Sequence, residues 1–114
     1  MATGEWTYEV LKEVSLELPG ILEFRIDEIG SYVVMSNRLS RRIRDYEGNE
    51  KRLREGRPYA SGGSGFRRIH QLLHKATEDG RTVTVVACEN CSQADLFARR
   101  RHWVERVGTL NNPA

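Results

Sequence analysis

Apolar and polar positions alternate along the first third of the chain. Every second residue is apolar over residues 14–18, and the alternation returns over residues 22–26 after the turn signal Pro19-Gly20. Residues 32–35 form a third apolar run after Gly30-Ser31. The alternation at residues 6–10 extends the first strand, or alternatively belongs to a short helix over residues 5–13. A period of two is typical of strands with one buried face, so we predict an antiparallel β-meander over residues 5–35.

The rest of the chain reads mainly as helices. Ser36-Asn37 can cap a helix that ends at Gly48-Asn49, and the polar, glycine-rich residues 49–65 then predict a long loop. An apolar stripe at helical spacing predicts a helix over residues 66–79. The β-branched run at residues 83–87 is typical of an interior strand. A last helix begins near Asn90 or Ser92 and ends at Gly108.

These elements predict an α+β fold: an N-terminal antiparallel β-meander plus one further strand, with two or three helices packed on one face. At 114 residues we expect a single domain over residues 1–114. No apolar run approaches the roughly 20 residues that span a bilayer, and the N-terminus shows no secretory signal. The sequence has only two cysteines, too few for a disulfide framework, so we expect a cytoplasmic protein.

The net charge of +2 conceals an asymmetry along the chain. Residues 1–35 hold seven acidic and two basic residues, a net −5, so the remaining residues carry +7. Fifteen of the 18 basic residues are arginine, whose planar guanidinium suits phosphates and carboxylates. The alternative is that these arginines are simply solvated surface residues.

Two arginine clusters are the main candidates for binding. The first, on the helix after residue 37, comprises Arg38, Arg41 and Arg42, with Arg44 nearby. The second, on the last helix, comprises Arg99, Arg100 and Arg101 beside Trp103. Arginines next to an aromatic ring can neutralise phosphates while the ring stacks on a base, although Trp103 would equally serve as a core residue. The clusters predict an anionic partner: nucleic acid or an acidic protein surface.

The loop Ser61-Gly62-Gly63-Ser64-Gly65 leads into a helix, an arrangement that favours anion binding. Pro58 precedes this loop, and after it come the helix to Gly80, the strand at residues 83–87, Asn90, Ala94, Leu96-Phe97 and Trp103. In this order of features, residues 58–108 resemble the cofactor-binding half of the GCN5-related N-acetyltransferases. That resemblance implies that Gly63 and Gly65 hold the pyrophosphate of acetyl-CoA. Ser61 departs from the family, which usually has arginine or glutamine there.

Cysteine and histidine positions raise two further alternatives. The order of His70, His74, Cys88 and Cys91 supplies the ligand types of a structural zinc site. The C-x-x-C spacing between a strand and a helix also resembles the redox site of thioredoxin-like proteins. We expect neither, and predict surface histidines, free thiols and no cofactor.

Together these observations predict a small non-enzymatic binding protein. Its arginine-rich surface would engage nucleic acid or an acidic protein, and short arginine-rich domains of this kind resemble accessory proteins of phages or mobile elements. A reduced acetyltransferase-like fold that binds acetyl-CoA at the Gly62–Gly65 turn is the alternative.

Overall fold

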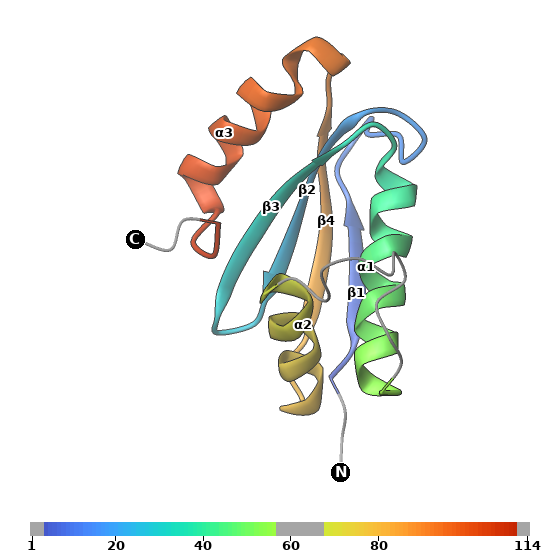
Figure 1. The fold of residues 1–114 in the computed structure, drawn as a ribbon. Helices are drawn as coiled ribbons and strands as arrows, with labels where there is room; N and C mark the ends of the chain where they lie inside the picture. Colours follow the sequence, from blue (N-terminus) through green and yellow to red (C-terminus); the bar gives the residue numbers. More distant parts are fainter. Residues whose placement is uncertain (1–3, 57–67, 112–114) are drawn as a thin grey trace.

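The computed structural model describes residues 4–56 and 68–111. Its strands form one sheet in the order β1-β4-β2-β3 and three α-helices pack against that sheet (Figure 1). The elements are β1 (Trp6–Val10), β2 (Gly20–Ile26), β3 (Gly30–Ser36), α1 (Leu39–Arg54), α2 (Arg68–Glu78), β4 (Val83–Asn90), the short 3₁₀ helix η1 (Gln93–Asp95) and α3 (Leu96–Val107). The predicted α+β class is confirmed, with its N-terminal antiparallel strands, its further strand and its helix count.

The first strand joins the sheet at a place that the sequence pattern did not predict. β2 pairs antiparallel with β3 through a turn at residues 27–29, as expected, and also pairs antiparallel with β4. β1 does not extend this meander; it pairs parallel with β4, with Trp6 opposite Val83. Local alternation predicts that a strand exists, but it does not specify a pairing partner 77 residues away.

Residues 14–18 were predicted as a strand, and this prediction is wrong. They lie in the connection between β1 and β2, where the backbone is hydrogen-bonded to the Asn90 side chain rather than to a neighbouring strand. Its Nδ2 donates to the carbonyls of Ser15 and Pro19, and its Oδ1 accepts from the Ser15 N–H at 2.7 Å. Val14 and Leu16 still pack on the core, so the alternation in the sequence reflects their burial, although the segment is not a strand.

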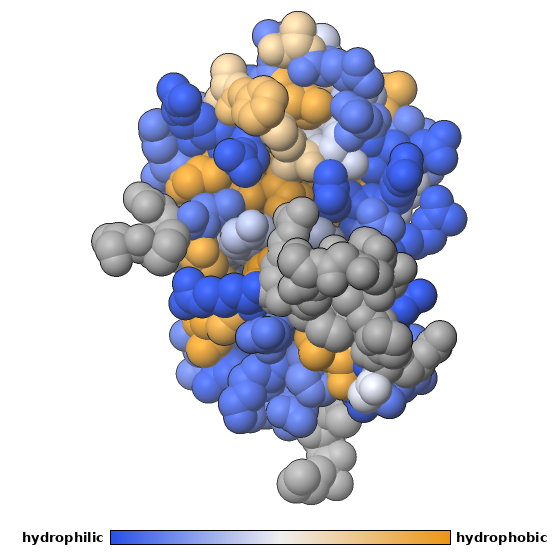
Figure 2. All heavy atoms as spheres, in the orientation of Figure 1, coloured by the Kyte–Doolittle hydropathy of each residue, from blue (hydrophilic) through white to orange (hydrophobic). Residues whose placement is uncertain are grey.

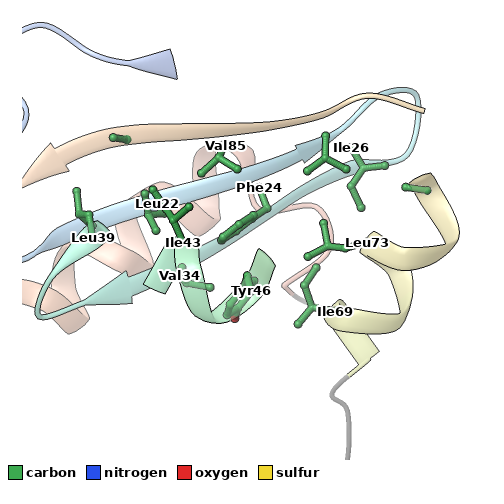
Figure 3. Close-up of a cluster of buried hydrophobic side chains, with 13 residues drawn as sticks. Leu22, Phe24, Ile26, Val34, Leu39, Ile43, Tyr46, Ile69, Leu73 and Val85 are labelled. Carbon is green, nitrogen blue, oxygen red and sulfur yellow. The ribbon is translucent and has the colours of Figure 1, made fainter. Parts of the chain in front are cut away.

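The larger core lies between the sheet and the pair α1 and α2 (Figure 3). Phe24 of β2 stacks on Tyr46 of α1 with ring centroids 4.5 Å apart, and Leu73 of α2 is fully buried beside them. Two helices on one face are what the sequence predicted.

The third helix covers the opposite face of the sheet. Along β4, Val83 and Val85 belong to the larger core, whereas Val86 and Cys88 point the other way. There α3 packs Trp103, Val104 and Val107 over Ile21 and Val33 of the neighbouring strands, forming a second core. The continuous apolar run of β4 therefore reflects a strand that is buried on both faces.

α1 continues beyond its predicted end at Gly48-Asn49 and runs to Arg54. A glycine inside a helix costs only about 1 kcal/mol. Here Glu50 is buried and lies 3.5 Å from His74 of α2, so the helix continues where α1 packs against α2. Figure 2 shows hydrophilic residues over much of one face, with apolar residues gathered at the end where α3 begins; Phe97 is 70% exposed. In the described part of the chain, no helix is long and apolar enough to cross a membrane.

Candidate anion-binding site

The first arginine cluster lines a hollow at the start of α1, which we call the arginine hollow. The hollow has a volume of about 490 Å³. It is lined by Ser36, Asn37, Arg38, Arg41, Arg42 and Asp45. The structure therefore brings together Arg38, Arg41 and Arg42 of this cluster, whereas Arg44 lines a different cavity.

Helical periodicity explains why these arginines share one side of α1. Leu39 and Ile43 are buried under the helix against the sheet. Arg38, Arg41 and Arg42 fall between and beside these positions and so face outward together. α1 begins after Arg38, and the Ser36 hydroxyl binds the backbone of that residue: it donates to the Arg38 carbonyl at 2.6 Å and accepts from the Arg38 N–H at 3.1 Å.

The guanidinium groups of the hollow are available to a ligand. Among the described residues Arg38 forms one ion pair, to Glu17 at 3.6 Å, and both side chains are more than half exposed. Exposed pairs of this kind contribute only about 0–1 kcal/mol, so an anion can displace Glu17. Within the described residues Arg41 and Arg42 form no ion pair, and the buried Nε of Arg42 has no hydrogen-bond partner.

The charge of the hollow is positive. Three arginines face one aspartate among its lining residues, which gives a formal +2. The N-terminus of α1 adds the positive end of its dipole. Two of its first N–H groups, those of Leu39 and Ser40, already donate to carbonyls of Leu18 and Leu16. An anion would therefore be held chiefly by the arginine side chains.

The second arginine cluster is arranged differently. On α3, Arg99 donates to the Glu89 carboxylate through Nε at 2.8 Å and Nη2 at 2.7 Å. Trp103 donates its indole N–H to the same carboxylate at 2.5 Å and packs into the second core. Arg100 and Arg101 have no ion pair among the described residues and lie apart from the arginine hollow, on the helix that covers the opposite face.

Glu89 is held as a carboxylate by these contacts. Partial burial alone would raise its pKa, but the hydrogen bonds from Arg99 and Trp103 outweigh this effect and keep the pKa below its usual value. The same contacts orient the Trp103 ring toward the sheet, and Arg106 lies 5.8 Å from the ring centroid. Trp103 is partly buried against the second core, and base stacking by its ring stays a prediction.

The four residues of the zinc hypothesis do not converge. His70 is buried against Tyr46, so the prediction of surface histidines is wrong for this residue, and His74 lies between Glu50 and Glu78. Cys88 belongs to the second core, on the other face of the sheet. No group of three or more metal-ligating side chains occurs in residues 4–56 and 68–111. Successive residues of a strand face opposite sides of the sheet, and Cys88 of β4 faces α3. The sheet therefore separates Cys88 from His70 and His74, which lie on α2.

The thioredoxin-like alternative also lacks support in the environment of its cysteines. Burial, together with the charge of Glu23 and Glu89, raises the pKa of Cys88 to about 12. A reactive redox thiol needs a lowered pKa. The Cys88 thiol instead lies against the Val86 carbonyl at 3.6 Å, as a buried strand residue.

The glycine positions implied by the acetyltransferase resemblance, Gly63 and Gly65, lie outside the described residues. The element before them is the helix α1 rather than a strand. Acetyl-CoA binding at this turn therefore stays a prediction. Comparison of the chain with models of protein families, with curated proteins and with solved structures finds no match.

Sequence reasoning missed Ser36, Asn37 and Asp45 as parts of the arginine hollow. It predicted Ser36-Asn37 as the cap of this helix, and that prediction is wrong, because the N-cap residue is Arg38, which makes no side-chain cap hydrogen bond. It also missed Glu50, which is 2% exposed. The signal was present: Leu39, Ile43 and Tyr46 define a stripe that reaches Glu50 one turn later. Ending the helix at Gly48 hid that continuation.

Proposed function

We propose that this chain is a small non-enzymatic domain that binds nucleic acid, and that the arginine hollow contacts the phosphate backbone. The observation that carries the proposal is the convergence of Arg38, Arg41 and Arg42 on one hollow with a formal +2 charge. A guanidinium donates several hydrogen bonds in a fixed plane and cannot be deprotonated near neutral pH, so three of them suit a phosphate.

The shape of the hollow favours a phosphate over a flat acidic protein surface. The hollow is concave, and its other polar groups, Ser36 and Asn37, are neutral side chains of the kind that contact phosphate oxygens. The predominance of arginine over lysine supports the same ligand. The experiment below distinguishes nucleic acid from an acidic protein partner.

The test is fluorescence anisotropy with a labelled duplex and a labelled single strand across a salt series. Each phosphate contact to duplex contributes about −0.9 to the slope of log K against log salt, so three arginines predict a slope near −3. Arg41→Ala with Arg42→Ala should weaken binding and flatten the slope by about two.

The matched control is Arg100→Ala with Arg101→Ala, which removes the same charge from α3. It should change the slope by less than the hollow variant does, because these arginines lie outside the hollow. A chain that binds neither nucleic acid at low salt, or a control variant that flattens the slope as much as the hollow variant, contradicts the proposal. The first of these outcomes would favour an acidic protein as the partner.

A further inference from the structure

A second cavity lies at the other end of α1. It occupies about 550 Å³ where the C-terminal end of α1, the start of β1 and α2 come together (Figure 1). The residues that matter for its chemistry are Trp6, Glu50, Arg54, His74, Thr77 and Glu78. Its volume falls within the range of about 300–1,000 Å³ that is typical of small-molecule sites.

Glu50 is the central group of this cavity. Its side chain is 3% exposed, and Oε1 accepts a hydrogen bond from Arg54 Nη2 at 3.1 Å. Within the described residues the second oxygen, Oε2, is buried and accepts no hydrogen bond, and His74 Nδ1 lies 3.5 Å from it. A buried carboxylate oxygen without a donor is costly, and a ligand that donates to it would remove the cost.

The charges around the cavity favour a cation. Glu50 and Glu78 contribute two negative charges and Arg54 contributes one positive charge. Arg54 is already engaged with Glu50 Oε1. His74 lies between the carboxylates, with Nε2 at 3.5 Å from Glu78 Oε2. Glu50, Glu78 and Arg54 together carry a formal −1, which matches a ligand with a single ammonium group.

Trp6 adds a second requirement. Its indole N–H is buried in the described structure without a hydrogen-bond partner. This donor needs an oxygen acceptor, which an alkyl ammonium ion lacks. The indole ring also contacts Phe24 edge to face, with centroids 6.1 Å apart, and this contact holds it in the cavity wall.

We propose that this cavity binds a small hydroxylated amine, of the amino alcohol or amino sugar class. The ammonium group donates to Glu50 Oε2, and a hydroxyl oxygen accepts from the Trp6 indole N–H. Glu78 at the rim, whose side chain is 57% exposed, supplies a second carboxylate for the cation. The site is separate from the arginine hollow, so it does not depend on nucleic-acid binding.

The two tryptophans of the chain make a direct test possible. In a ¹H–¹⁵N NMR spectrum of the labelled protein, in buffer free of amines, the two indole N–H signals report Trp6 and Trp103 separately. Titration with glucosamine or serinol should move the Trp6 signal saturably and leave the Trp103 signal in place. Glucose and glycerol are the neutral counterparts of the two probes and should move the Trp6 signal much less.

Variants then test the role of the carboxylate. Glu50→Gln should weaken amine binding about tenfold or more, because a charge-assisted hydrogen bond is lost. Glu105→Gln on α3, which removes the same charge elsewhere, should bind as the unmodified chain does. Should Glu50→Gln fail to fold by circular dichroism, Glu78→Gln at the rim replaces it and should weaken binding severalfold.

The proposal is overturned if neither amine moves the Trp6 signal at millimolar concentrations. It is also overturned if glucose and glycerol act as strongly as their amine counterparts, or if the folded carboxylate variant binds with unchanged affinity.

Discussion

The two arginine clusters look alike in the sequence and differ in the fold. At the start of α1, the guanidinium groups of Arg41 and Arg42 share a hollow and form no ion pair among the described residues. On α3, Arg99 is bound at 2.7–2.8 Å by Glu89, which also accepts from Trp103. For Arg99, the difference lies in one acidic residue on β4. Arg99 is therefore engaged inside the protein, whereas Arg100 and Arg101, like Arg41 and Arg42, form no ion pair among the described residues; what sets the first cluster apart is that its arginines line one hollow.

The largest effect that the comparison predicts is on stability at the α3 cluster. Trp103→Ala should lower the free energy of unfolding by about 2–3 kcal/mol, since it removes a large, partly buried aromatic side chain that packs on the second core and a donor to Glu89. Chemical denaturation followed by circular dichroism measures this change. A loss below about 1 kcal/mol would mean that Trp103 is not a core residue, given what aromatic truncations cost in cores.

Glu89→Ala should destabilise the protein by about 2 kcal/mol, because Arg99 and the Trp103 indole N–H lose their shared acceptor. Asp45→Ala at the arginine hollow is the matched control, since it removes one carboxylate that has no ion pair among the described residues. Surface changes of that kind usually stay within about 0.5 kcal/mol. Equal losses in the two variants would remove the distinction between the clusters.

Acid should weaken the α3 cluster selectively. The pKa of Glu89 is lowered in the folded chain, so its contribution is fully present above its usual pKa of 4.5 and is lost as the pH falls through the lowered value. The difference in unfolding free energy between the unmodified chain and Glu89→Gln should be constant near neutral pH and shrink in acid. A difference that grows in acid would contradict the assigned direction of the pKa.

The smallest stability effect is expected in the arginine hollow. Arg38→Ala removes only the exposed pair with Glu17, so the free energy of unfolding should change by about 0.5 kcal/mol or less. The same variant should still weaken nucleic-acid binding. Thermal denaturation measures the change in stability, and anisotropy on the same preparation measures the change in nucleic-acid binding. A large stability loss would show that Arg38 has a structural role.

Local patterns predicted the elements whose burial follows their own periodicity. The strands β2, β3 and β4 and the helix α2 were all anticipated, because alternation or an apolar stripe directly reflects the face that each buries. The same reasoning failed for residues 14–18, where Asn90 binds the backbone of Ser15 and Pro19. Asn90 is distant in the chain, so its hydrogen bonds leave no pattern in the sequence of residues 14–18.

The candidate site was predicted in part. The arginines of the hollow were named from the sequence because they cluster along one predicted helix. Their availability was not predictable, since it depends on which carboxylates the sheet brings near: Glu89 of β4 reaches Arg99, and no such residue reaches Arg41 or Arg42 in the described structure. Glu50 was missed because Gly48 was taken as a helix end, whereas packing against α2 carries the helix past it.

The measurement that tests the central claim most directly is the salt dependence of duplex binding for two double variants. Arg41→Ala with Arg42→Ala and Arg100→Ala with Arg101→Ala remove the same number of charges from the two clusters. The first should flatten the slope of log K against log salt by about two, and the second should change it by less than one. Equal flattening by both variants would show a diffuse arginine surface and would contradict a binding site at the start of α1.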